Sequence, residues 1–428
     1  MQKPVTVAIV GLGGRGKDTY APMALSRPDL MKIVAIADIV PEKVDEVARL
    51  YGVPRERCFD SAEALLREPR LADVLFVCTQ DRQHVGHAIP ALQKGYHLLL
   101  EKPISPVLSE CQRVLAEAKK ADRQVVVCHV LRYTPFFQKI KAVLDAGRIG
   151  EVVSVMALEN VVYWHQAHSF VRGNWRREED TSPMILQKSC HDLDILLWLL
   201  GDRCARVSSF GSLRHFRPEM APAGAAERCR DCSARDGCPY DAYKIYLTNE
   251  ETGVLAGHTG WPADIVAMHP NEARIRAALE DGPYGRCVYH CDNDVVDHQV
   301  VNLELEHGQT VSFTMCAFTK TGGRTLKIMG THGDIRADMH ENTIDVEPFD
   351  APSEHVEVRT LAEDLSGHAG GDIRMVEEYL EMLASGGRPS GTLSTLEASV
   401  ESHLAALAAE ESRKHGGRAV EIAPLRGL

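Results

Sequence analysis

The N-terminal stretch Val5–Gly16, VTVAIVGLGGRG, limits the possible folds of this chain more than any other feature. Its first half is a short apolar run of mainly β-branched residues, which predicts a strand buried on both faces. The run continues directly into a G-x-G-x-x-G pattern formed by Gly11, Gly13 and Gly16. There the first glycine permits a tight turn, the second lets the backbone approach a pyrophosphate, and the third lets the following helix pack closely. The start of that helix would offer free N–H groups to the phosphates, so the stretch predicts a dinucleotide-binding turn.

A carboxylate at the end of the next predicted strand supports this interpretation. The apolar segment Lys32–Ala37 is followed by Asp38, which lies 22 positions after Gly16. An acidic residue about 20 positions after the glycines typically accepts a hydrogen bond from the ribose 2′-hydroxyl. Because a carboxylate there repels a 2′-phosphate, the sequence favours NAD over NADP. The alternative is a glycine-rich turn in some other α/β protein, which would not require the strand, the helix and the acid in this order.

Length, charge and composition restrict the class of protein. A chain of 428 residues is too long for one compact core, so two domains are expected. The net charge of −12 argues against a nucleic-acid partner, which requires a basic surface. No apolar run approaches the length of a membrane span, and the N-terminus lacks the layout of a signal peptide. We therefore expect a cytoplasmic protein with no membrane partner.

The first part of the chain alternates apolar strand-like runs with amphipathic segments. Such alternation predicts parallel strands joined by crossover helices, a doubly wound Rossmann sheet over residues 1–128. Helices are expected at 42–51 and 109–121, and strands at 5–10, 32–37, 73–78, 97–100 and 124–128. Ligands bind such sheets beyond the carboxyl ends of the strands. The residues of interest are therefore those just after each strand: the glycine turn, Asp38, Thr79, Gln80, Glu101 and Lys102.

The remainder, residues 129–428, has a different pattern and predicts a second α/β domain. Strand-like runs follow one another without regular helices between them, which is typical of a large, mostly antiparallel open sheet. Long helices close the chain at about 366–415. Strands are expected at 151–162, 299–305, 310–317, 326–329 and 343–346.

Two short motifs carry candidate catalytic groups. Lys102 follows an apolar strand at the mouth of the expected cofactor site, where its amine could bind a substrate hydroxyl and stabilise charge during hydride transfer. His191 and Asp194 lie three positions apart at the start of a predicted helix, so they share one face and could form a proton-transfer pair. The structural alternatives are a solvated surface lysine and a core or capping histidine that is hydrogen-bonded to the acid.

Together these segments resemble the Gfo/Idh/MocA family, which includes glucose–fructose oxidoreductase and inositol dehydrogenase. The motifs cover most of the chain and fall in the family's order: GLGGRG, Asp38, EKP at 101–103, LRYTPFF from Leu131, HDLD at 191–194 and GTHGDIRAD from Gly330. The resemblance implies NAD(P)-dependent oxidation or reduction of a sugar or cyclitol hydroxyl, and an open sheet often used to form dimers or tetramers. It also implies that Lys102 and His191 meet at the reacting carbon and that the bond to Pro103 is cis.

Motifs and resemblance together give a set of candidate functional residues. The catalytic candidates are Lys102, His191 and Asp194. The cofactor is expected to contact Gly11, Gly13, Gly14, Arg15, Gly16, Asp38, Thr79, Gln80, His84, Glu101, Lys102 and Arg132. The substrate is expected to contact Gln187, Tyr133, Asp292 and Asn293.

The sequence departs from the family pattern in two places. Many members carry an aspartate four residues before the histidine, where this chain has Gln187, which cannot take a proton. The second departure is an insertion at about 214–297 that contains the pattern C-x2-C-x5-C. Two thiolates separated by two residues can bind one metal ion from a single turn, and in a reducing compartment clustered cysteines favour a metal over disulfides. We therefore expect a structural zinc site formed by Cys229, Cys232, Cys238 and Cys287, with Cys291, Cys204 or His215 as other candidates for the fourth ligand.

Free thiols and an iron–sulfur site are the alternatives to zinc in the insertion. For the whole protein, the leading hypothesis is an NAD-dependent oxidoreductase that acts on a hydroxyl of a sugar, glycoside or cyclitol. One alternative, found among proteins of this family, is a glycoside hydrolase that oxidises a sugar hydroxyl transiently with tightly held NAD and then eliminates the aglycone. Another is a non-catalytic NAD-binding regulator, which the missing aspartate motivates and the intact Lys102 and His191 argue against.

Overall fold

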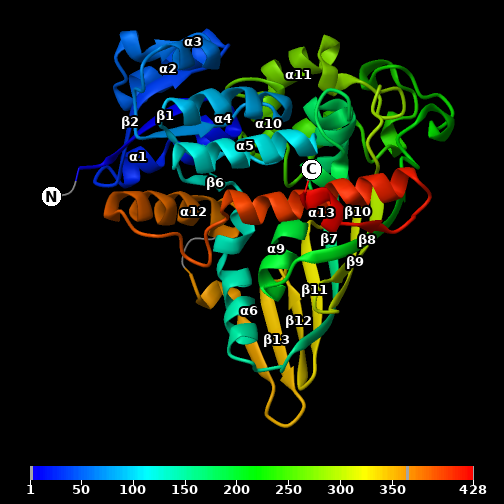
Figure 1. Ribbon diagram of the computed structural model, residues 1–428. Helices are drawn as coiled ribbons and strands as arrows, with labels where there is room; N and C mark the ends of the chain where they lie inside the picture. The colour runs from blue at the N-terminus through cyan, green and yellow to red at the C-terminus, as the bar shows by residue number, and fades with distance from the viewer. Residues whose placement is uncertain (1–2, 363–365, 428) are drawn as a thin grey trace.

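A computed structural model describes residues 3–362 and 366–427 and contains two β-sheets (Figure 1). The N-terminal sheet has six parallel strands in the order β3-β2-β1-β4-β5-β6. The five predicted strands are confirmed to within one residue at each end, and the additional two-residue β3 gave no sequence signal. The strands are β1 (Val5–Val10), β2 (Met31–Ala37), β3 (Cys58–Phe59), β4 (Val74–Val77), β5 (His97–Leu100) and β6 (Val125–Val127).

The strand order reverses beside β1, whose two neighbours in the sheet are β2 and β4. In a doubly wound sheet, ligands bind outside the carboxyl ends of the strands at such a reversal. Because β1 ends at Val10, the glycine turn lies at this point. The connecting helices are the π-helix η1 (Gly14–Tyr20), α1 (Met23–Ser26), α2 (Pro41–Tyr51), α3 (Ala62–Arg67), α4 (His84–Gln93) and α5 (Leu108–Ala121).

The second sheet has nine strands in the order β14-β13-β12-β11-β7-β10-β9-β8-β15. Its pairs are antiparallel, as predicted, except that β7 and β10 are parallel, because the chain leaves the sheet after β7 and returns through β8 and β9. The strands are β7 (Val152–Val162), β8 (Cys204–Ser212), β9 (His298–Leu305), β10 (Thr310–Thr319), β11 (Gly323–Gly330), β12 (Gly333–Asp338), β13 (Thr343–Pro348), β14 (Glu354–Glu357) and β15 (Val420–Glu421).

Helices α12 and α13 cross the middle of the molecule, between the two sheets (Figure 1). Met375 and Val376 of α12 belong to one apolar cluster with residues of β1 and β4, and Ser394, just before α13, accepts a hydrogen bond from Val127 N (3.0 Å). The C-terminal helices thus pack on the N-terminal sheet and bring the start of α12 close to the glycine turn. The remaining helices named below are α6 (Pro135–Asp145), α7 (Tyr163–His165), η5 (Gln166–Arg172), α8 (Met184–Gln187), α9 (Cys190–Leu200), α12 (Ser366–Ser385), α13 (Leu396–Lys414) and α14 (Ala423–Arg426).

The predicted insertion occupies the chain between β8 and β9 and includes the short helices α10 (Ala263–Val266) and α11 (Glu272–Asp281). It has an apolar cluster of its own, in which Phe216, Tyr246 and Ile275 are buried. It is therefore an ordered subdomain rather than a loose loop. Within the described parts of the chain, none of the helices combines the length and the apolar character that a membrane crossing requires.

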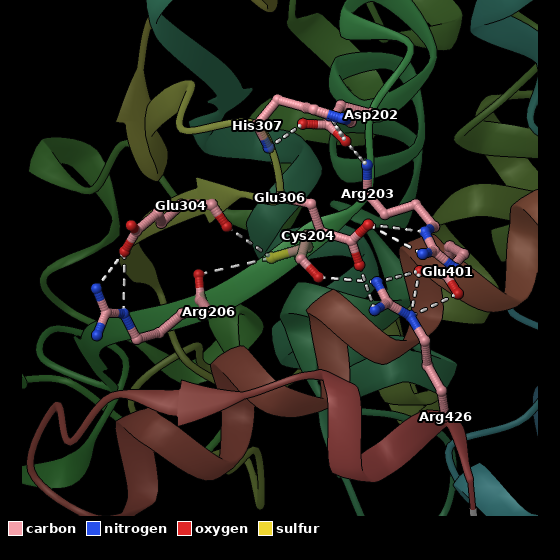
Figure 2. Close-up of polar contacts among 9 residues, drawn as sticks. All are labelled: Asp202, Arg203, Cys204, Arg206, Glu304, Glu306, His307, Glu401 and Arg426. Carbon is pink, nitrogen blue, oxygen red and sulfur yellow. Dashed lines mark hydrogen bonds and ion pairs between the residues drawn. The ribbon is translucent and has the colours of Figure 1, made fainter.

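Ion pairs attach the C-terminal segment to the edge of the nine-stranded sheet. Figure 2 shows Arg426, at the end of α14, directed at Glu306 and at Glu401 of α13. Its guanidinium lies 2.6 Å from Glu306 Oε1 and 2.8 Å from Glu401 Oε2, and Arg203 contacts the same Glu306 at 2.9 Å. Because the Glu306 carboxylate binds both Arg203 and Arg426, this network joins the ends of β8 and β9 to the C-terminal helices.

Candidate active site

The glycine turn at the end of β1 has the steric form that the sequence predicts. Gly11 has a φ of +89°, and a Cβ added there would lie 2.4 Å from Cys78 O. A Cβ on Gly16 would lie 2.1 Å from the Gly11 carbonyl, so neither position tolerates a side chain. At Gly13 and Gly14, by contrast, a Cβ would meet no protein atom within 4 Å. The turn is tight on its inner side and open on the outer side, which fits the approach of a dinucleotide phosphate.

Asp38 lies beside this turn, just after β2. Its Oδ2 accepts a hydrogen bond from Leu12 N (2.6 Å) and its Oδ1 accepts one from Val40 N (2.8 Å). The carboxylate therefore fixes the backbone of the glycine turn.

Lys102 follows β5 on the same edge of the sheet, and its peptide bond to Pro103 is cis, as the resemblance implies. Its Nζ donates a hydrogen bond to the backbone carbonyl of Gln187 (2.8 Å), which links the strand to the segment before α9. Among the described residues, Lys102 has no carboxylate within ion-pair distance. Its charge is thus available to a ligand.

Glu101 and Arg15 form a buried network under Lys102. Glu101 Oε1 accepts hydrogen bonds from Arg15 Nε (2.8 Å) and from Tyr20 OH (2.6 Å). Arg15 also donates to Asp372 of α12 (2.6 Å). Burial would raise the pKa of Glu101, but the charge of Arg15 outweighs it and lowers that pKa, so the carboxylate is ionised. The network connects the glycine turn, β5 and α12.

His191 occupies the first turn of α9 and is 6% exposed. Its ring centroid lies 5.7 Å from that of His129 and 5.9 Å from that of His368. Burial lowers the pKa of His191 well below its usual value, and the positive charge of Lys102 lowers it further. The imidazole is therefore neutral near pH 7 and able to accept a proton. Its Nδ1 is buried without a hydrogen-bond partner among the described residues.

A second amine, for which no sequence motif indicates a role, lies next to Gln187. Lys188 Nζ is 3.1 Å from Glu159 Oε1, and Glu159 also contacts Arg324 (2.9 Å). Arg324 in turn binds Asp192 at 2.7 Å, and burial raises the pKa of Asp192 to about 6. In this cluster the cations Lys188 and Arg324 pair with the carboxylates of Glu159 and Asp192. Neither carboxylate therefore takes the place of the aspartate missing at position 187.

Asp194 and Arg132 form a buried ion pair with each other. Arg132 Nε and Nη2 donate to the two oxygens of Asp194 at 2.7 and 2.6 Å, and both residues are buried. Tyr133 is also buried, and its hydroxyl accepts a hydrogen bond from Ser394 N (2.9 Å). Partners from other segments thus already bind these groups, and the expected substrate contact of Tyr133, cofactor contact of Arg132 and proton transfer by Asp194 stay predictions.

The predicted cofactor residues after β4, which are Thr79, Gln80 and His84, contact other groups of the protein at the edge of the site. Thr79 Oγ1 lies 3.0 Å from His87 Nδ1. His84 lies between two carbonyls, with Nδ1 2.7 Å from Pro103 O and Nε2 3.0 Å from Thr79 O. Gln80 makes a capping contact with Gln83 through its backbone N–H (3.3 Å). His84 therefore joins the turn after β4 to the lysine turn after β5.

Asp292 and Asn293 hold the insertion together. Asp292 contacts Arg176 at 3.0 Å and Arg286 at 2.6 Å, and the hydrogen bond from Arg176 lowers the pKa of Asp292. Asn293 Nδ2 donates to Phe216 O (3.1 Å). The expected substrate contacts of both residues gain no support from this placement.

The structure does not form the predicted zinc site at Cys229, Cys232, Cys238 and Cys287. Over residues 3–362 and 366–427, no three histidine, cysteine or acidic side chains are arranged to hold a metal ion. The Cys229 thiol instead accepts hydrogen bonds from Arg172 Nη2 (3.6 Å) and Ala242 N (3.5 Å), and a buried guanidinium beside it disfavours a second cation. Burial also raises the pKa of Cys287 to about 11.

These features define a dinucleotide-binding oxidoreductase, with a glycine turn, a lysine and a neutral histidine gathered at one edge of a doubly wound sheet. Residues 5–129 match the sequence profile of the oxidoreductase family GFO_IDH_MocA, NAD-binding Rossmann fold, and residues 141–422 match the profile of its C-terminal alpha/beta domain. The chain therefore belongs to the Gfo/Idh/MocA family and is an NAD(P)-dependent oxidoreductase.

Individual relatives are distant. The chain is 24% identical over 334 residues to the putative oxidoreductase YteT of Bacillus subtilis, which is 74% of each protein. It is 28% identical over 198 residues to inositol 2-dehydrogenase of Pseudomonas fluorescens, covering 46% of this chain and 54% of that enzyme. Similar solved structures include an oxidoreductase domain protein from Kribbella flavida, with a TM-score of 0.72 and 17% identity over 99% of this chain and 100% of that one. An oxidoreductase from Agrobacterium radiobacter, solved with NAD+, L-tartaric acid and magnesium, has a TM-score of 0.69 and 18% identity over 99% and 100%.

Proposed function

We propose that this protein oxidises a hydroxyl of a sugar, glycoside or cyclitol with NAD as the hydride acceptor. The observation that carries the proposal is the hydrogen bond from the Lys102 amine, which follows β5 of the N-terminal sheet, to the carbonyl of Gln187, four residues before the neutral imidazole of His191. An alcohol must lose a proton as its carbon gives up a hydride, so an adjacent cation and base are the groups that the reaction needs.

The two side chains have complementary tasks in this proposal. Lys102, held by the Gln187 carbonyl, donates a hydrogen bond to the reacting hydroxyl and stabilises the developing alkoxide. His191 accepts the hydroxyl proton, which its lowered pKa permits at neutral pH. Bound NAD supplies the hydride acceptor, and Gly11, Gly13 and Asp38 are the residues expected to hold it.

Aromatic side chains near the lysines support a carbohydrate substrate. Trp261 of the insertion is 45% exposed, and its ring lies 4.8 Å from that of His165 and 5.3 Å from that of Trp164. Burial lowers the pKa of His165, and the charges of Lys188 and Lys102 lower it further, which places this aromatic group near both amines. Sugar rings have apolar faces that pack on such surfaces. The names of the inositol dehydrogenases among the relatives point to the same substrate class.

The proposal is tested by incubating the protein with NAD and a panel of sugars, glycosides, sugar acids and cyclitols. We expect NADH absorbance to rise in proportion to the oxidised product. Release of free sugar from a glycoside with no net NADH would instead indicate the hydrolase alternative. Retained NAD binding without turnover on any member of the panel would indicate a regulator.

The preference for NAD is expected to depend on Asp38. Replacement of Asp38 by Asn removes a charge that accepts hydrogen bonds from ribose and repels a 2′-phosphate, so the ratio of NAD to NADP affinity should fall by about 10–100-fold. Dissociation constants of both cofactors measured by titration calorimetry check this. Because Asp38 also binds Leu12 N, the NAD affinity should fall as well. An unchanged ratio would mean that the carboxylate does not face the ribose.

We also propose that the protein forms a homodimer or homotetramer through the nine-stranded sheet. The solvent-facing side of this sheet carries exposed apolar side chains: Val153, Met156, Leu158, Phe210 and Phe318. Met156 is 53% exposed and Phe210 is 57% exposed, which is unusual for large apolar side chains that share one face. A second copy of the chain would bury them, and light scattering measures the mass.

A further inference from the structure

His368 and Asp372, at the start of α12, form a histidine–carboxylate pair beside His191. His368 Nδ1 lies 3.0 Å from Asp372 Oδ2, and the rings of His368 and His191 are 5.9 Å apart between centroids. An imidazole whose Nδ1 donates to a carboxylate presents Nε2 as its proton acceptor, the arrangement that orients the base in serine hydrolases. The His368 side chain is 44% exposed, whereas His191 is 6% exposed. The buried imidazole of His191 thus has a neighbour, His368, that is accessible to solvent.

The Asp372 carboxylate is held in its charged form. Burial alone would raise the pKa of Asp372, but the hydrogen bond from His368 and the charge of Arg15 outweigh it and lower that pKa. Arg15 Nη2 donates to Asp372 Oδ1 (2.6 Å), while its Nε donates to Glu101. The pair is therefore anchored to the glycine turn and to the strand that carries Lys102.

The backbone at His368 is also unusual. His368 has a φ of 42° and the following Ala369 a φ of 54°, both in the left-handed region that residues with a Cβ seldom adopt. Such conformations persist where surrounding contacts compensate for them, and they cluster at functional sites. The left-handed turn directs the His368 side chain to Asp372, one helical turn further along.

We propose that His368 and Asp372 are a proton relay that takes over the task of the aspartate missing at position 187, and this inference rests on the proposed function. In each turnover the substrate O–H bond breaks and its proton goes to His191, while the electron pair of the C–H bond leaves with the hydride to NAD. The proton then passes from the His191 imidazole to His368 Nε2, directly or through one water, and from there to solvent. Asp372 stabilises the His368 imidazolium formed in the transfer.

Several charged and titratable groups near His368 determine whether its pKa is raised or lowered. The protein atoms around the ring lower the pKa of His368, Asp372 raises it, and Arg15 and Lys188 lower it. His191 and His165 are the other titratable neighbours. Asp372 is the one group among these that favours the imidazolium, so replacement of Asp372 by Asn must lower the pKa of His368.

The first experiment measures this shift without turnover. The His368 imidazole is titrated by NMR in the cofactor-free protein, with the resonance assigned by its absence in His368→Gln. We expect Asp372→Asn to move the midpoint to lower pH by about one unit or more. The exposed pair of His355 and Asp345, with Nδ1 2.6 Å from Oδ1, provides the control, because Asp345→Asn should shift His355 and leave His368 unchanged. An unchanged His368 midpoint in Asp372→Asn overturns the relay.

The second experiment measures turnover in His368→Ala. We expect kcat to fall by about 10²-fold or more, the NAD dissociation constant to stay near that of the wild type, and added imidazole to restore a large part of the rate. The rescue should grow as pH rises and more of the added imidazole is neutral, which a purely structural role would not produce. His355→Ala should keep wild-type kcat. A rate in His368→Ala near that of the wild type, or a loss that imidazole does not reverse, overturns the relay. Absence of turnover in the wild type would overturn the proposed function and with it the relay, whereas an unchanged His368 midpoint in Asp372→Asn overturns the relay alone.

Discussion

Replacement of His191 by alanine is expected to lower kcat by about 10²–10⁴-fold, the usual contribution of a positioned general base. The imidazole is neutral because burial and Lys102 lower its pKa, and its ring lies 5.9 Å from that of His368, whose partner Asp372 binds Arg15 of the glycine turn. NAD binding should remain close to that of the wild type, because no contact of the glycine turn or of Asp38 depends on this side chain. Initial-rate kinetics and titration calorimetry on the same preparation give both quantities.

The pH dependence of the wild type adds a second check on His191. A base must be deprotonated to accept the hydroxyl proton, so kcat/KM, which reports the pKa values of the free enzyme, should fall as pH decreases through the pKa of this group. Because that pKa is lowered well below its ordinary value, the acid limb should lie well below pH 6.5, the ordinary histidine pKa. The exposed His332, replaced by alanine, serves as a control that should leave kcat unchanged. Wild-type turnover in His191→Ala would contradict the proposed mechanism.

The parts of the fold and site that depend on local sequence were predictable. The glycine turn requires Gly11 and Gly16 for steric reasons that the pattern itself encodes, and the structure shows a Cβ at either position colliding with backbone. Five of the six strands in the N-terminal sheet followed from alternating apolar and amphipathic runs, and Lys102 could be placed because it directly follows a strand. These predictions needed only periodicity, turn chemistry and the order of segments along the chain.

The parts that depend on distant partners were not predictable. His368 and Asp372 reach His191 because α12 packs against the N-terminal sheet, and no local motif indicates that a segment so far along the chain returns to the site. The cysteine pattern predicted zinc, but Arg172, from another element, contacts the Cys229 thiol instead. Sequence spacing shows which side chains share a turn or a helix face, whereas only the tertiary structure shows which groups from distant segments contact them.

Asp194 is another residue whose partner, Arg132, the local sequence does not reveal. Its replacement is the second variant for which we expect a large effect. Its spacing from His191 predicts a shared helix face, and both residues lie on α9, yet both oxygens of Asp194 bind the buried Arg132. Removing one member of such a pair leaves an uncompensated charge, so Asp194→Ala should lower the free energy of unfolding by about 3–5 kcal/mol. Denaturant unfolding followed by fluorescence measures the change. Because the pKa of arginine lies far above neutral pH even in buried sites, the Arg132 guanidinium remains charged in the variant and cannot relieve the cost by losing its proton.

The double variant Arg132→Met/Asp194→Leu separates a structural pair from a catalytic acid. Replacing both charges by apolar side chains removes the unpaired group, so most of the stability lost in Asp194→Ala should return. Turnover should then also return to a large extent, because Lys102 and His191 keep their positions when the core around α9 is restored. If instead Asp194→Ala unfolds like the wild type but has lost its activity, the carboxylate takes part in the chemistry, and the assignment of Asp194 to the Arg132 pair is wrong.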